Sequence, residues 1–183
     1  KIATPEVKEK KQTQKVVSQP SLFDLFATNE TENSEYENVE TSNNRQHTYY
    51  LVDTEEKINN LTDKLKSAEK FSFDTETTSI EPINAKLVGM SFAVKEDEAF
   101  YVPVPKEEGE AKKVVARFKE ILENENSQKI GQNIKYDYIV MKNYGVNIKG
   151  EFFDTMVAHY LLQPDGHHNM DYLAEVYLGH KTI

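Results

Sequence analysis

Residues 71–76 read Phe71-Ser72-Phe73-Asp74-Thr75-Glu76, a run in which apolar and polar side chains alternate. Such alternation is typical of a strand with one buried face, so Phe71 and Phe73 are expected in the core. Side chains two apart project from the same face of a strand, and Asp74 and Glu76 therefore point together. Two neighbouring carboxylates repel unless a cation intervenes, and Mg²⁺ or Mn²⁺ suits oxygen ligands. Taken alone, the pair is also explained by solvated acids at an exposed strand end.

The segments around this strand alternate between β and α patterns. Further strands are expected at residues 49–52, 87–94, 100–104 and 129–131. Apolar residues recur at helical spacing over 58–68, 114–122 and 136–144, and two more helices are expected over 155–162 and 170–178. The expected helix caps are Asp53 with Glu56, Asp154, Asn169, Gly145 and Gly179. A β-hairpin followed by interleaved helices predicts an α/β fold, a mixed β-sheet flanked by helices.

Length and composition predict one domain with a tail. A chain of 183 residues can bury one real core but hardly two. Residues 1–48 contain few large apolar side chains, and the stretch 27–44 has five Glu and neither Lys nor Arg. We therefore expect a disordered linker at 1–48 and a folded domain at 49–183.

Charge and cysteine usage restrict the function further. The net charge is −9, with 31 acidic against 22 basic residues, which argues against a chain that holds nucleic acid by long-range attraction alone. The absence of Cys excludes disulfides and thiolate metal sites. No apolar run approaches the roughly 20 residues that span a bilayer, so we expect a soluble, cytoplasmic protein with no membrane partner.

A second group of polar residues lies at Gly131-Gln132-Asn133-Ile134-Lys135-Tyr136-Asp137, between a short strand and a helix. If the helix includes both, Asn133 and Asp137 lie one turn apart on the same face. The alternative is an N-capping Asn followed by an ordinary acid on the helix surface. Combined with Asp74 and Glu76, however, a helix-borne third acid matches the requirement of a two-metal phosphodiester site.

These residues also resemble a known family. Residues 71–78 resemble the first exonuclease motif of the DEDD superfamily, and 131–137 resemble its second motif, Asn-x-x-x-Asp. The 3′-5′ proofreading exonuclease domains of bacterial DNA polymerase I are the most similar group, on the evidence of residues 131–137, 153–156, 169–175 and 180–183. The resemblance covers 49–183 and implies a ribonuclease-H-like fold that removes mispaired nucleotides from a DNA 3′ end.

The resemblance also implies roles for individual residues. Asp74 would bridge two divalent ions, Glu76 would hold the ion that activates water, and Asp137 would serve the second ion, largely through water. The ions would be Mg²⁺ or Mn²⁺, with Zn²⁺ as a further option. Thr77 and Asn133 would contact the substrate or support the ligands. The implied partners are a single-stranded or frayed DNA 3′ end and the rest of a polymerase I chain near the bacterial nucleoid.

The family's third motif, Tyr-x-x-x-Asp, does not occur after Asp137. No Asp stands four residues after Tyr138, Tyr144, Tyr172 or Tyr177. Family spacing would put the motif beyond Ile183, so the resemblance implies a C-terminally truncated domain. We expect this chain alone to be inactive or nearly so. Robust Mg²⁺-dependent trimming by the pure chain, abolished by Asp74→Ala, would overturn that expectation.

The tail contains one apolar island. Gln19, Leu22 and Phe23 stand in Gln19-Pro20-Ser21-Leu22-Phe23, which resembles the Gln-x-x-Leu-Phe peptide that docks bacterial replication proteins into the sliding clamp. A flexible tether that presents two apolar anchors to a groove would suffice for such docking. Alternatively, the island packs on the protein's own surface or lies in the linker.

Other polar residues have structural explanations. His167, His168 and Asp165 could suggest a transition-metal site, but adjacent histidines point different ways and Pro164-Asp165-Gly166 signals a turn. We expect a solvated loop there. Asp154 and Asp171 stand near helix starts, where capping and the helix dipole explain them.

Three functions remain open from the sequence: a DNA proofreading exonuclease, a ribonuclease-D-like RNA exonuclease, and a non-catalytic spacer between polymerase modules. The acids Asp74, Glu76 and Asp137 do not separate the first two functions, because a metal site acts on the phosphate while the 2′-hydroxyl is read elsewhere. Only the similarity of the flanking segments to polymerase I favours DNA.

Overall fold

A computed structural model describes residues 40–41 and 46–181 of the chain. Its strands are β1 (Glu40–Thr41), β2 (Thr48–Leu51), β3 (Lys70–Thr77), β4 (Leu87–Lys95), β5 (Glu98–Pro103), β6 (Gln128–Gly131), β7 (Phe152–Asp154) and β8 (His180–Lys181). Its helices are α1 (Glu55–Lys66), α2 (Glu108–Ala116), α3 (Lys119–Leu122), α4 (Ile134–Asn143), α5 (Thr155–Leu162) and α6 (Met170–Leu178).

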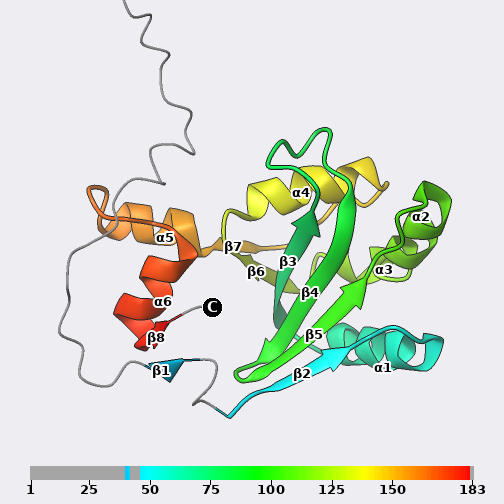
Figure 1. Ribbon diagram of the computed structural model, residues 1–183, viewed down its shortest axis with the longest axis horizontal. Helices are drawn as coiled ribbons and strands as arrows, with labels where there is room; N and C mark the ends of the chain where they lie inside the picture. The colour runs from blue at the N-terminus through cyan, green and yellow to red at the C-terminus, as the bar shows by residue number, and fades with distance from the viewer. Residues whose placement is uncertain (1–39, 42–45, 182–183) are drawn as a thin grey trace, which may run out of the picture. The chain divides into compact units, whose positions relative to one another are not determined.

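Six strands form one mixed sheet in the order β2-β5-β4-β3-β6-β7 (Figure 1). β3, β4 and β5 are antiparallel neighbours, whereas β2 pairs parallel with β5, and β6 pairs parallel with both β3 and β7. β1 and β8 form a separate parallel pair. The expectation of an α/β fold with a mixed sheet flanked by helices is therefore confirmed.

The alternation of β3 separates the two faces of the sheet. Phe71 and Phe73 are each 1% exposed and contact the ring of Phe92 on β4. This face belongs to the hydrophobic core, together with apolar residues of α1 to α4. The opposite side of β3 carries Ser72, Asp74 and Glu76, of which Asp74 is half-buried and the other two are exposed. The buried phenylalanines thus place both acids on the open face.

Two helix boundaries differ from the sequence-based expectation. Thr54, not Asp53, is the N-cap of α1: its side chain accepts from the Lys57 N–H, while Asp53 forms an ion pair with the Lys57 ammonium. The helix expected over 114–122 is interrupted between α2 and α3. There, i→i−3 hydrogen bonds tighten the turn, and Phe118 stacks on Phe92 with ring centroids 5.1 Å apart.

The expectation that His167 and His168 lie in a solvated loop is wrong for one of the two. His167 is exposed, but His168 is buried, and its Nδ1 lies 2.7 Å from the Nδ1 of His159 on α5. The loop between α5 and α6 folds back over α5, which the local turn signal did not reveal. Other helix expectations are confirmed: Asp154 caps α5, Asn169 caps α6, and Gly179 follows α6 with φ 61°.

Two expectations concern residues largely outside this description. The linker at 1–48 and the island at Gln19, Leu22 and Phe23 lie wholly or mostly among residues that the structure does not describe, so both stay predictions. In the described part of the chain, no helix is long and apolar enough to cross a membrane.

Candidate metal centre

The two strand acids lie at the end of β3 beside an irregularity in the sheet. Asp74 pairs across the ladder with Ser91, and Glu76 pairs with Gly89. The register between β3 and β4 shifts after Glu76, where a β-bulge locally bends a strand and re-aims its side chains. The sheet therefore presents both carboxylates from one open face.

The third acid reaches β3 from α4. β6 pairs with β3 only over Lys70–Ser72, so the following part of this edge of β3 has no strand partner there. Asp137, in the first turn of α4, takes that place: its Oδ1 accepts from the Thr75 N–H at 2.9 Å and from the Thr75 Oγ1 at 2.6 Å. Thr75 had not been singled out from the sequence, although it stands between the two strand acids. These bonds hold Asp137 beside the backbone of the Asp-Thr-Glu triplet.

Burial and mutual repulsion perturb two of the acids. Burial raises the pKa of Asp137 to about 7; hydrogen bonds from Thr75 oppose this rise, and the charge of Asp74 adds to it. Burial also raises the pKa of Asp74, with a further contribution from Glu76. Asp74 therefore interacts electrostatically with each of the other two acids, and the three belong to one electrostatic site.

The carboxylates do not form a ready-made cage. Among the residues that the structure describes, no three His, Cys, Asp or Glu side chains converge to hold one ion. Asp74 interacts electrostatically with Glu76 and with Asp137. The donor set nevertheless fits a hard divalent cation, because it consists of carboxylate oxygens and because a cation would relieve the repulsion that raises the pKa of Asp74.

The two predicted substrate residues stand at the end of β3 and at the start of α4. The Thr77 hydroxyl donates to the Ser79 carbonyl at 3.0 Å and lies 2.5 Å from the Tyr136 hydroxyl, which also donates to Ser79. Asn133 precedes α4 with a left-handed φ of 57°, and its side chain makes no cap bond. It therefore lies outside the helix that would have aligned it with Asp137. Tyr136 ties α4 to the end of β3 through these bonds.

A hollow of about 700 Å³ opens beside Asp74. Its wall combines the open sheet face with apolar residues of α5 and α6, including Leu173 and Tyr177. Asp74 is the only one of the three acids that lines it. The hollow therefore brings an apolar surface to one side of the strand acids.

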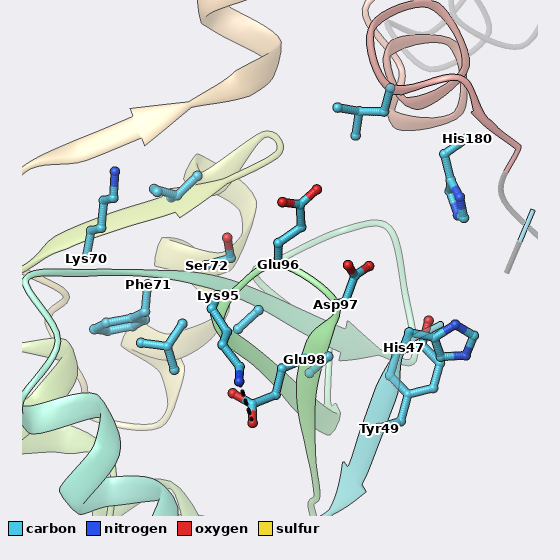
Figure 2. Close-up of a pocket in the computed structure, with 15 residues that line it drawn as sticks. His47, Tyr49, Lys70, Phe71, Ser72, Lys95, Glu96, Asp97, Glu98 and His180 are labelled. Carbon is cyan, nitrogen blue, oxygen red and sulfur yellow. Dashed lines mark ion pairs between the residues drawn. The ribbon is translucent and has the colours of Figure 1, made fainter. Parts of the chain in front are cut away.

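A second hollow of about 540 Å³ lies further along the same sheet and shares five lining residues with the first, namely Ser72, Ala93, Ala99, Ile130 and Leu178. Figure 2 shows its charged rim, where the Lys95 ammonium lies 3.7 Å from the Glu98 carboxylate. None of the three candidate acids lines it. The carboxylate donor set at the end of β3 therefore lies outside this second hollow.

Comparison with protein-family models shows which family the chain belongs to. Residues 49–183 match the family model described as 3′-5′ exonuclease. The chain belongs to this exonuclease family. Membership implies dependence on divalent metal ions, in agreement with the carboxylate donor set of the exonuclease domain.

Curated relatives of the exonuclease domain are bacterial polymerases. The chain is 36% identical over 162 residues to DNA polymerase I of Borreliella burgdorferi, covering 87% of the chain and 18% of that protein. It is 45% identical over 130 residues to DNA polymerase I of Pseudomonas aeruginosa, covering 66% of the chain and 14% of that protein. The chain thus spans less than a fifth of the length of either relative.

Solved structures confirm the fold. RNase D of Trypanosoma brucei in complex with RNA superposes with a TM-score of 0.62 at 18% identity, over 74% of the chain and 48% of that protein. Brucella melitensis NrnC with bound Mg²⁺ gives a TM-score of 0.55 at 16% identity, over 73% of the chain and 62% of that protein. At such identities the likeness establishes the exonuclease fold alone.

The raised pKa of Asp137 predicts a pH effect on the metal-free exonuclease domain. The ordinary pKa is 3.8 and the folded-state pKa is about 7, so the folded state binds the extra proton between these values. Stability should therefore fall as pH rises from about 4 to about 7, by up to about 4 kcal/mol, with Asp74 acting in the same direction. Urea unfolding in EDTA at several pH values measures this slope.

The control for this pH effect is Asp137→Asn, which keeps a side chain of similar shape but does not titrate. It should flatten the slope, leaving the smaller contribution of Asp74. Mn²⁺ should bind more tightly as pH rises through 7, because the ion competes with the proton on Asp137. An equally steep slope in the Asn variant would show that the titration of Asp137 does not cause it.

Proposed function

We propose that this domain hydrolyses the 3′-terminal phosphodiester of DNA with two divalent ions bound by Asp74, Glu76 and Asp137. One observation carries the proposal: Asp137 from α4 is hydrogen-bonded to Thr75, between the two strand acids. Through these bonds the helix acid lies against β3 beyond the residues that pair with β6, beside the triplet that carries the two strand acids. The boundary at residue 49 and the site roles belong to the same proposal.

The three acids would have different roles in binding the two ions. Asp74 interacts electrostatically with both other acids and would contact both ions, while the exposed Glu76 would hold the ion nearer solvent. Asp137 would orient water on the second ion through the oxygen that Thr75 does not engage. When bound, the ions would activate water and stabilise the leaving oxygen. Thr77 and Asn133 would border the path of the substrate strand.

DNA is the proposed substrate because the similar curated proteins are DNA polymerases. The likeness to RNase D structures supports the fold but at too low an identity to carry substrate choice. RNA trimming therefore stands as the second candidate function. The site itself does not discriminate, because the acids act on the phosphate.

The wider setting is also proposed from the relatives. The domain would work inside a cytoplasmic polymerase I chain near the nucleoid, on a 3′ end frayed from the polymerase site. Mg²⁺ or Mn²⁺ would serve the site, with Zn²⁺ as an alternative ion. Gln19, Leu22 and Phe23 would dock into the sliding clamp; this part stays a prediction because the motif lies outside the described residues.

A chimera provides the test of substrate and activity. Residues 49–183 replace the matching segment of the Pseudomonas aeruginosa polymerase, which surrounds the site with the remaining parts of a related enzyme. We expect Mg²⁺-dependent release of 3′ nucleotides from single-stranded DNA, at least about tenfold faster than from RNA of the same sequence, a difference of about 1.4 kcal/mol. Single-turnover assays with labelled strands measure both rates.

The results for the chimera are interpreted by comparing it with the isolated chain and by comparing RNA with DNA as substrate. The 183-residue chain alone should trim DNA slowly or not at all, because its sequence contains three of the four acids that the family motifs require. Faster trimming of RNA than of DNA would support the RNase-D-like function. A chimera that folds and retains polymerase activity but trims neither strand would favour a non-catalytic spacer.

A further inference from the structure

Asp154, the last residue of β7, caps two helices at once. Its carboxylate accepts hydrogen bonds from four backbone N–H groups. Two belong to the start of α4: Asn133 N–H to Oδ1 and Ile134 N–H to Oδ2, both at 3.0 Å. The other two belong to the first turn of α5: Met156 N–H at 2.9 Å and Val157 N–H at 3.2 Å, both to Oδ1. One side chain therefore joins the N-termini of both helices.

Only half of this arrangement follows from local sequence. Asp154 directly precedes α5, where an Asp is a favourable N-cap. Its contact with α4 spans about twenty positions, and α4's own N-cap residue, Asn133, makes no side-chain cap bond. The first N–H groups of a helix have no partner within the helix, so Asp154 supplies the cap that Asn133 does not. Two helix dipoles also favour a negative charge at this point.

The capped turn leads directly to the metal centre. Asp137 lies in the first turn of α4, three residues after Ile134, and reaches β3 through its bonds to Thr75. Any rotation or retreat of this turn would displace the Asp137 carboxylate relative to Asp74. Misplacement by about 1 Å can cost a catalytic site 100-fold in rate.

Neighbouring bonds hold the turn between β6 and α4 from two sides. The hydroxyl of Thr155, next to Asp154, donates to the Gly131 carbonyl at 3.2 Å and to the Gln132 side chain. The Gln132 amide in turn donates to the His168 carbonyl at 2.6 Å. The start of α5 and the loop before α6 thus fix the backbone from which α4 begins.

We propose that Asp154 is a positioning residue of the exonuclease site, which couples α5 to α4 and thereby sets where Asp137 stands. The proposal rests on the function proposed above, since it concerns a ligand of that site. Asp154 itself does not touch the ions or the substrate. Its effect on the metal passes through the backbone of α4.

The variant Asp154→Ser separates the two caps. Ser is among the favourable N-cap residues, so its hydroxyl can still cap α5. Its shorter side chain has a single oxygen and does not extend to the N–H groups of Asn133 and Ile134. The variant should therefore remain folded but lose the link to α4. Amide hydrogen exchange should become faster at Ile134 and stay slow at Val157.

The metal response of the 183-residue chain gives the second readout. In Asp154→Ser, the Mn²⁺ concentration that half-saturates the rise in thermal midpoint should increase about 10- to 100-fold, the range seen when groups that orient metal ligands are removed. Asn169→Ser is the matched control. Asn169 caps only α6, through the Tyr172 N–H at 2.8 Å, so its replacement by Ser, another favourable N-cap residue, should leave Mn²⁺ binding unchanged.

The possible results distinguish a failure of the positioning role of Asp154 from a failure of the proposed metal site. Wild-type Mn²⁺ dependence in Asp154→Ser, or an equal change in Asn169→Ser, would overturn the positioning role. Unchanged exchange at Ile134 would overturn it as well. Absence of any Mn²⁺ effect on the wild-type chain would count against metal binding by the three acids, and hydrogen exchange would then decide whether Asp154 couples the helices.

Discussion

Asp74→Asn is expected to abolish metal-dependent trimming by the chimeric polymerase, lowering its rate by at least about 10³-fold. Asp74 is the acid that interacts with both Glu76 and Asp137, so its loss breaks both carboxylate pairs. A metal ion contributes several kcal/mol to transition-state stabilisation, and about 1.4 kcal/mol corresponds to tenfold in rate. Single-turnover trimming of labelled DNA measures the loss.

The same substitution has an effect that does not require activity. The 183-residue chain should melt at a higher temperature in Mn²⁺, since binding to the folded state raises apparent stability, and Asp74→Asn should remove that rise. Without metal, the variant should be at least as stable as the wild type, because it removes a half-buried charge beside Glu76.

Glu56→Gln is the control, because it removes one negative charge from the exposed surface of α1. It should change neither the trimming rate nor the Mn²⁺ response. Wild-type trimming by the Asp74→Asn chimera would refute the assigned site. A loss of trimming in both variants would indicate that the overall negative charge of the domain, and not the assigned site, causes the effect.

Phe92→Ala is expected to reduce the free energy of unfolding by about 3–5 kcal/mol, a large share of a typical domain's stability. Phe92 is 1% exposed and stands among Phe71, Phe73 and Phe118, with centroid distances of 6.2, 5.2 and 5.1 Å. Removing its ring would leave a cavity between the sheet and the turn before α3. The aromatic contacts on three sides limit how far the core can collapse to fill it.

Urea unfolding of the two proteins measures this effect, with the midpoint shifting at an unchanged m value. Ile83→Ala is the matched surface control, because Ile83 is 70% exposed and its truncation should cost less than about 0.5 kcal/mol. A loss below 1 kcal/mol in Phe92→Ala would mean that the core around β4 is less tightly packed than its contacts indicate.

Local sequence was sufficient for most elements of the fold. The alternation in residues 71–76 identified β3, its buried phenylalanines and the shared face of Asp74 and Glu76, because strand geometry alone determines which side chains share a face. Asp154 correctly marked the start of α5, and Asn169 and Gly179 correctly marked both ends of α6. These signals work because caps act within a few residues along the chain.

The errors occurred where distant segments decide local structure. The N-cap of α1 is Thr54, one residue after the expected Asp53. Helical spacing did not indicate the break between α2 and α3, where Phe118 stacks on Phe92. His168 was expected in solvent but is buried against His159. Asn133 does occupy the N-cap position of α4, but the carboxylate of Asp154, and not the Asn133 side chain, accepts from the first N–H groups there.

The sequence by itself determined the class of fold and the family, and it led to the proposal of the three acids, because periodicity and motif spacing are properties of the chain. Tertiary structure alone decided how those acids meet. Asp137 takes the place of a missing strand partner at Thr75, and Asp154 caps a helix that begins some twenty residues before it. Both contacts satisfy backbone groups that distant segments leave without partners, and no local pattern in the sequence specifies which side chain will do so.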